Sequence, residues 1–295
     1  MKIRFWGVRG SIASPGPKTV KYGGNTSCIE VETDEGDHIV LDAGTGIAPL
    51  SLTFLAKLPL TCSIFITHTH WDHIQGLPFF VPIFIPNNKI DIYGAFDPIS
   101  HKSVREIMSA QMEYCFFPVR EAELKAEINY HTLIEKQTVT VGSAKITNIL
   151  MNHPVLSYGY RIESNGKAMF FTGDHEPLYN IYEPGDDYYT EYENLISHKN
   201  AQMYDIIRGV DVLIADAAYT DDEYKIKRGW GHGTISSTIA MAKAAEVKSL
   251  YLTHYEPTRG DDNLEQLYQD ALTQYPLSSG TPPFFLAREG HEIIL

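Results

Sequence analysis

The sequence has little cysteine, and the cysteines are not arranged for cross-links or for a thiolate metal site. The three residues are Cys28, Cys62 and Cys115, an odd count without the close pairing of cysteine-rich zinc sites. We therefore expect small buried hydrophobic side chains in a reduced compartment. This excludes a disulfide framework and favours a cytoplasmic location.

Long apolar runs and an excess of positive charge are also lacking. No window approaches the ~18 consecutive apolar residues of a membrane span, and the opening MKIRFWGVRGSI lacks the apolar core of a signal peptide. We expect no membrane contact. With 24 Lys and Arg against 37 Asp and Glu, the formal net charge is −13. Such an acidic surface repels polyphosphates, so we expect no extended nucleic-acid surface.

Nothing in the chain reads as an interdomain linker, and β-rich runs occur between helical patterns throughout. Helical patterns cover 46–57, 100–110 and 234–246. Short β-rich apolar runs cover 2–6, 28–33, 38–42, 62–67, 89–93, 138–141, 145–150, 158–163, 168–172, 211–215, 249–253 and 283–286. This pattern in both halves predicts an α/β protein, and we expect residues 1–295 to form one domain.

Four potential metal ligands fall within six positions, directly after a strand-like run. His68, His70, Asp72 and His73 lie in THTHWDHIQG, which follows CSIFIT. Alternate residues of an extended loop point the same way, so His68 and His70 can reach one ion while Asp72 and His73 turn toward another. Imidazole and carboxylate groups suit Zn²⁺, Mn²⁺ or Fe²⁺. Such a dense group rarely arises for packing, and it predicts a metal site.

Three further candidates each follow a predicted strand. His153 comes after 145–150, Asp174 after 168–172 and His254 after 249–253. Singly, each is an ordinary loop residue. In this order after HTHWDH, however, the chain resembles the metallo-β-lactamase superfamily and its HxHxDH signature over nearly its whole length.

That resemblance implies an αββα four-layer sandwich of two mixed β-sheets, with metal ions at one edge. It also implies a metal-dependent hydrolase with two divalent ions, Zn²⁺ first and Mn²⁺ or Fe²⁺ next. One ion would take His68, His70 and His153, and the other would take Asp72, His73 and His254. Asp174 would bridge the two ions.

The segments FWGVRGSIASPGPKTVKYGGNTSCIEVE and GHGTISSTIAMAKAAEVKSLYLTHYEP resemble the ribonuclease Z-like branch. In that branch a histidine precedes a Ser/Thr-containing helix, about twenty residues before the last histidine ligand. His232 occupies this place, 254 − 232 = 22 positions before His254. It is the candidate general acid because imidazole titrates near neutrality, although a structural role remains open. Asp72 is the second catalytic candidate, as a water-polarising group or as the partner of His232.

The branch contains tRNA 3′-processing endoribonucleases and small phosphodiesterases. We find no Gly/Pro/Lys-rich arm, and segment 175–205 is rich in Tyr and acids. A small phosphodiester such as a cyclic nucleotide is therefore the expected substrate. Alternatives are tRNA 3′ processing, hydrolysis of a carboxylic ester, lactone or thioester, and a metal-binding sensor. Segment 175–205 is interpreted as a solvated insertion or helical lid, or alternatively as an interface such as that of a homodimer.

Four residues are candidates for substrate contacts. Asn25 and Thr26 lie in YGGNTSC, where a turn without a function is an equal alternative. Arg9 is a candidate for a substrate phosphate. Tyr219 follows the strand 211–215 and is a candidate for the cleft, with a packed tyrosine as the alternative.

Overall fold

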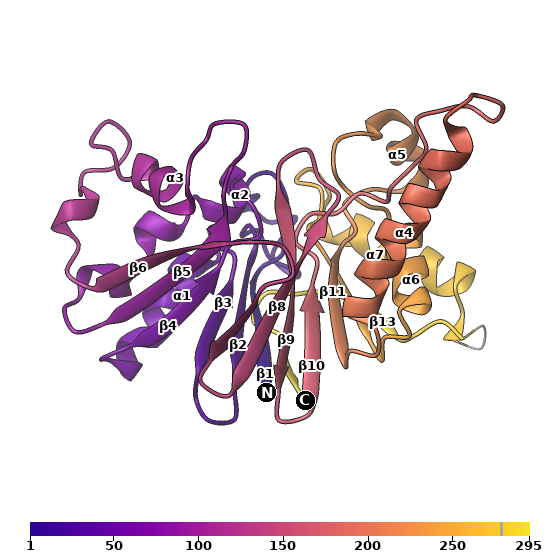
Figure 1. Ribbon diagram of the computed structural model, residues 1–295. Helices are drawn as coiled ribbons and strands as arrows, with labels where there is room; N and C mark the ends of the chain where they lie inside the picture. Colours follow the sequence, from indigo (N-terminus) through magenta and orange to yellow (C-terminus); the bar gives the residue numbers. More distant parts are fainter. Residues whose placement is uncertain (278–279) are drawn as a thin grey trace.

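Two seven-stranded sheets lie face to face in the computed structural model, which describes residues 1–277 and 280–295 (Figure 1). The first sheet has the order β14-β1-β2-β3-β4-β5-β6. Its strands are β1 Lys2–Gly7, β2 Cys28–Glu32, β3 His38–Leu41, β4 Thr61–Phe65, β5 Lys89–Ala95, β6 Glu127–Leu133 and β14 Glu292–Ile294.

The second sheet has the order β13-β12-β11-β10-β9-β8-β7. Its strands are β7 Thr138–Val141, β8 Ala144–Met151, β9 Ser157–Ser164, β10 Lys167–Phe171, β11 Val212–Asp216, β12 Leu250–Thr253 and β13 Phe284–Leu286. Each sheet is mixed, because β3 to β6 and β10 to β13 pair in parallel while the other neighbours are antiparallel.

Three apolar layers hold the sandwich together. Phe5, Phe65 and Phe171 are fully or almost fully buried between the two sheets. Helices cover the outer face of each sheet (Figure 1), and their bounds are α1 Ile47–Phe54, α2 Trp71–Ile74, α3 Val104–Gln111, α4 Tyr189–Ile207, α5 Asp221–Lys227, α6 Ile235–Ala244 and α7 Asp261–Gln274. The predicted α/β class and αββα sandwich of two mixed sheets are confirmed.

The twelve predicted strands correspond to β1–β5 and β7–β13, with small shifts at their ends. Strands β6 and β14 and helices α2, α5 and α7 were not predicted, and Asp72 and His73 lie in α2 where an extended loop was expected. Segment 175–205 contains an irregular stretch followed by most of α4, in agreement with the helical interpretation. The expectation for the thiols is correct for Cys28 and Cys62 but wrong for Cys115, which is exposed in the turn after α3. Within the described ranges, no helix is long and apolar enough to cross a bilayer.

Candidate metal centre

Four loops bring all seven predicted metal ligands together at one edge of the sandwich. His68 follows β4 of the first sheet, and the same loop continues into α2, which carries Asp72 and His73. The other three follow strands of the second sheet: His153 follows β8, Asp174 follows β10 and His254 follows β12. Strand direction explains the meeting within the second sheet, because β8, β10 and β12 run in the same direction and so end at the same edge.

The first group joins His68, His70, His153 and Asp174. His70 Nδ1 lies 3.0 Å from His68 Nε2 and 3.1 Å from His153 Nε2. Asp174 Oδ2 is 3.4 Å from His68 Nε2 and 3.8 Å from His153 Nε2. His70 is the exposed member, so this group lies on the solvent side of the cluster.

The second group joins Asp72, His73, Asp174 and His254. Asp72 Oδ2 lies 3.3 Å from His73 Nε2 and 3.2 Å from His254 Nε2. Asp174 Oδ1 is 3.2 Å from His73 Nε2 and 3.0 Å from His254 Nε2. The two oxygens of Asp174 therefore face different groups, which is the arrangement that a bridging carboxylate requires.

The donor atoms fit divalent ions. Ligands about 2.0–2.1 Å from one tetrahedral ion lie about 3.3 Å from each other, close to the separations of 3.0–3.8 Å described above for the two groups. Asp174 Oδ1 is buried, and no described residue gives it a hydrogen bond of good geometry. A buried carboxylate oxygen in this state needs a cation. The His/Asp clusters are thus suited to a dinuclear metal site.

The charges of the cluster also indicate a cation. Burial opposes protonation of His73 and His254, but Asp174 and the other nearby carboxylates outweigh it and hold both pKa values well above the ordinary value. Burial and the neighbouring imidazoles instead lower the pKa of His68, which Asp174 opposes. Without an ion, the carboxylates thus recruit protons to two of the donor histidines. A metal ion and these protons compete for the same nitrogens.

Hydrogen bonds behind the ligands fix which ring nitrogen faces the cluster. His73 Nδ1 donates to Asp42 Oδ2 at 2.7 Å, and His153 Nδ1 donates to the Gly231 carbonyl at 2.8 Å. Each bond leaves Nε2 free as a donor to a metal ion. Sequence reasoning missed Asp42, although, like the ligands, it follows a strand of the sandwich.

Two glycines give the rings their space. A Cβ atom on Gly10 would lie 2.2 Å from Cε1 of His254, and one on Gly231 would lie 2.3 Å from Nδ1 of His153. Gly231 also has φ +90°, which an L side chain rarely adopts. Both positions therefore require glycine, and neither was singled out from the sequence.

Glu176 links the loop after Asp174 to the loop that carries His232. Its carboxylate accepts hydrogen bonds from Gly229 N at 2.7 Å, Gly231 N at 2.9 Å and Tyr224 Oη at 2.8 Å. The side chain is buried. Glu176 thereby sets the position of the Gly231 carbonyl that holds His153. Sequence reasoning also missed this residue.

His232 lies beside the cluster and is paired with Asp216, not with Asp72. Its Nδ1 donates to Asp216 Oδ2 at 2.9 Å, and its ring stacks on that of His254 with centroids 4.8 Å apart. Burial opposes protonation, but Asp216 and Asp174 raise the pKa of His232 above its ordinary value. Asp216, at the end of β11, had not been recognised as a site residue. Because Asp174, Asp216, His232 and His254 also group closely, a ligand role for His232 needs a direct test.

The predicted substrate contacts are mostly inside the protein. Arg9 is fully buried, donating through Nε to the Gly23 carbonyl and through a terminal nitrogen to the Arg259 carbonyl. It has no surface left for a substrate phosphate, so that expectation is wrong. Thr26 is also fully buried and bonds to Thr45, which indicates a structural turn.

Asn25 and Tyr219 both make their contacts within the protein. Both the backbone N–H and the side-chain amide of Asn25 donate to Glu289, at 2.6 and 2.9 Å. Tyr219 is 6% exposed and meets the His232 ring edge-on, with centroids 5.6 Å apart. Tyr219 therefore packs against the candidate acid, while Asn25 supports a turn.

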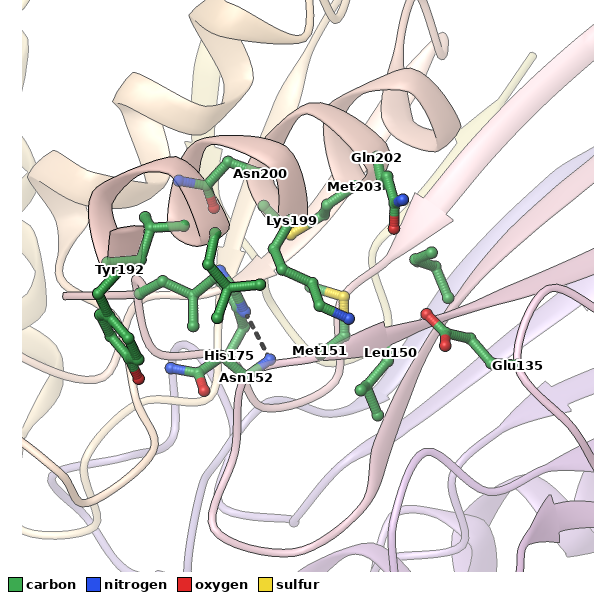
Figure 2. A pocket seen from close by; sticks show the side chains of 14 residues that line it. Glu135, Leu150, Met151, Asn152, His175, Tyr192, Lys199, Asn200, Gln202 and Met203 are labelled. Carbon is green, nitrogen blue, oxygen red and sulfur yellow. Dashed lines mark hydrogen bonds between the residues drawn. The ribbon is translucent and has the colours of Figure 1, made fainter. Parts of the chain in front are cut away.

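Two hollows lie beside α4, and the first of them adjoins the cluster. The first, here called the side cavity, has a volume of about 250 Å³ and is lined by residues that include His153, Pro154, Glu176, Tyr179, Tyr192 and Gly229. The second is an aliphatic crevice between β8 and α4, where Met151 and Met203 belong to the same apolar layer (Figure 2). Asn152 and Tyr192 line both hollows, so the two are neighbours.

A sandwich whose sheet edge gathers histidines and aspartates in two groups defines a metal-binding α/β protein. Comparison with known families agrees: the family described as "Beta-lactamase superfamily domain" matches residues 37–255. The chain therefore belongs to the β-lactamase superfamily, and it is a metal-dependent hydrolase.

Individual relatives are distant but match over the full length. A protein named Ribonuclease Z from Staphylococcus aureus (strain MSSA476) is 24% identical and aligns over 98% of each chain. The structure of human tRNase Z, short form, has a TM-score of 0.64 at 19% identity, covering 100% of this chain and 99% of that one. A diphosphatase from the PhnP family has a TM-score of 0.65 at 16% identity, covering 100% and 97%. Both structures support the fold.

Removal of metal should destabilise the protein, because only the folded chain assembles the seven ligands. An ion at about 100 times its dissociation constant adds about 2.7 kcal/mol to the free energy of unfolding. We expect thermal melts to show this gain when Zn²⁺ or Mn²⁺ is returned to chelator-treated protein. His131→Ala, at a histidine that pairs with Asp91 outside the cluster, should keep the gain. A melting temperature that does not respond to ions would contradict the metal site.

Proposed function

We propose that this chain is a dinuclear metal-dependent phosphodiesterase acting on a small phosphodiester such as a cyclic nucleotide. The observation that carries the proposal is the orientation of the Asp174 carboxylate. Its Oδ2 faces the first ligand group and its Oδ1 faces the second. One ion would be held by His68, His70, His153 and Asp174, and the other by Asp72, His73, Asp174 and His254.

A dinuclear centre, when bound, supplies hydroxide at neutral pH and neutralises the charge of a phosphate. The chain provides the remaining group that phosphodiester hydrolysis needs, a proton for the leaving oxygen. His232 is suited to hold it, because the Asp216 carboxylate favours the protonated ring and fixes it through Nδ1. Nε2 is then the atom that gives the proton to the leaving group.

The second candidate is tRNA 3′ processing, which the names of the relatives favour. Against it stand the net charge of −13 and the acidic stretch before α4. Ester, lactone or thioester hydrolysis at the same centre is a third possibility, for which the His232–Asp216 pair provides no specific argument. Membership of a hydrolase family argues against a metal-binding sensor, the remaining alternative. We also propose a homodimer, which light scattering after gel filtration would test.

A substrate panel tests the proposal. Cyclic nucleotides and bis-p-nitrophenyl phosphate should be hydrolysed with added Zn²⁺, Mn²⁺ or Fe²⁺, and more efficiently than p-nitrophenyl esters, lactones or a tRNA precursor. Elemental analysis of protein purified without chelator identifies the native ions. Efficient cleavage of the tRNA precursor with no turnover of cyclic nucleotides would reject the proposal in favour of the second candidate.

A further inference from the structure

We propose that the side cavity binds a planar aromatic ring of the substrate, such as a nucleobase. The inference rests on the proposed function, since it assumes that the substrate phosphate lies at the His/Asp cluster. It adds a recognition element that the cluster itself does not contain.

The cavity is placed correctly for the group next to the scissile phosphate. His153 stands between the two sites: it lines the cavity, and its Nε2 lies 3.1 Å from His70 Nδ1 in the cluster. Gly229, on another wall, begins the short stretch that ends at His232. A substrate held at the cluster would therefore have its next chemical group within reach of the cavity.

The walls have the chemistry of a ring site. Two phenol rings, Tyr179 and Tyr192, line the cavity with Leu178 and Pro154. The guanidinium of Arg228 lies 4.9 Å from the centre of the Tyr179 ring. Tyrosine faces and flat aliphatic surfaces accept the face of a heteroaromatic ring. The volume of about 250 Å³ limits the occupant to a group of nucleoside size.

The walls are held in place before any ligand arrives. Asn180 Nδ2 donates to the Tyr189 carbonyl at 3.0 Å and to Glu193 Oε1 at 2.9 Å, which ties the segment with Tyr179 to α4. On the other side, Asn152 Nδ2 donates to the Glu176 carbonyl at 3.0 Å. Binding would thus require little ordering of the protein, which favours affinity for a small ligand.

The surroundings favour a small ligand over a polymer. Exposed acids follow the cavity along the chain toward α4, at Glu183, Asp186, Asp187 and Glu191. Their charge repels the additional phosphates of a polynucleotide but hardly affects a neutral ring. The neighbouring aliphatic crevice of Figure 2 is lined by apolar side chains that suit an alkyl chain. A substrate with an alkyl group bound in that crevice is therefore the alternative that the test must distinguish from a ring bound in the side cavity.

Calorimetry on the metal-loaded full chain tests the inference without requiring turnover. The probes are adenosine monophosphate, ribose 5-phosphate and hexyl phosphate, which share the phosphate and differ in the attached group. We expect the adenosine compound to bind roughly 5- to 100-fold more tightly than ribose 5-phosphate, the range that one stacked base provides. Tyr179→Ala should remove about tenfold of this affinity and leave ribose 5-phosphate unchanged, while Tyr179→Phe should retain it.

The controls separate ring binding from general damage. Tyr114→Ala removes a tyrosine that is 75% exposed and distant in sequence, and it should change nothing. Equal binding of the adenosine and ribose compounds, or equal losses for both in Tyr179→Ala, would overturn the inference. Tightest binding of hexyl phosphate would overturn it in favour of an alkyl chain. Ring-dependent binding without hydrolysis of any phosphodiester would instead reject the proposed function and leave the ring site standing.

Discussion

Asp174→Ala is expected to abolish turnover and to reduce the metal content from two ions per chain to less than one. The physical reason is that the two oxygens of Asp174 face both ligand groups at 3.0–3.8 Å. Removing them takes a donor, and the negative charge that the two groups share, from both sites at once. Metal content by elemental analysis and hydrolysis of bis-p-nitrophenyl phosphate are the two measurements.

Asp174→Asn adds a sharper comparison, because it keeps the shape of the side chain while removing its charge. It should bind at most one ion tightly. The matched control is Asp222→Ala, since Asp222 is exposed and pairs only with Lys225 among the residues that the structure describes. Thermal melts establish that each variant folds. An Asp174→Ala protein with both ions and near-normal activity would remove Asp174 from the centre.

His232→Ala should lose activity in proportion to how poor the leaving group is. A general acid contributes typically ~10²–10⁴-fold when the leaving oxygen is a strongly basic alkoxide. We therefore expect a loss of this size on a cyclic nucleotide and a far smaller loss on bis-p-nitrophenyl phosphate, whose leaving group is stable as an anion. Metal content should be unchanged. Initial rates on both substrates measure the difference.

Asp216→Asn should show the same leaving-group dependence in weaker form, because Asp216 acts through His232 at 2.9 Å. His198→Ala, at an exposed histidine of α4, is the neutral control. Equal losses on both substrates would indicate that His232 positions the substrate or organises the metals. Loss of an ion would make it a ligand.

The sequence was sufficient for the parts of the site that are encoded locally. His68, His70, Asp72 and His73 lie within six positions, from the loop after β4 into α2, so their grouping follows from spacing. The strands that precede Asp174 and His254 are almost entirely buried, and the strand before His153 is rich in β-branched and apolar residues, so all three were recognisable. Strand β6 was missed because only Leu133 of its seven residues is buried, and α7 was missed because only Leu264 and Ala271 are.

Contacts between distant segments could not be predicted. Asp42 supports His73 from 31 residues away, and Asp216 supports His232 from 16. Arg9 appeared to be a free cation, but the structure places its guanidinium on the carbonyl of Arg259, 250 residues further along. The sequence position of a charged residue does not show which buried carbonyl or imidazole will be its hydrogen-bond partner. Such assignments depend on the packing of the two sheets.

The metal ligands follow strands of both sheets, so bound ions would connect the two sheets mechanically. Coordination would act as a cross-link, since the loop after β4 and the loops after β8, β10 and β12 would share the same ions. His68 and His254 are 254 − 68 = 186 positions apart, and only the folded chain brings them together, so the binding free energy of the ions stabilises both sheets. Metal loading should therefore slow hydrogen exchange in the strands of both sheets, including amides far from the cluster. Metal binding and the stability of the two packed sheets would then be thermodynamically linked.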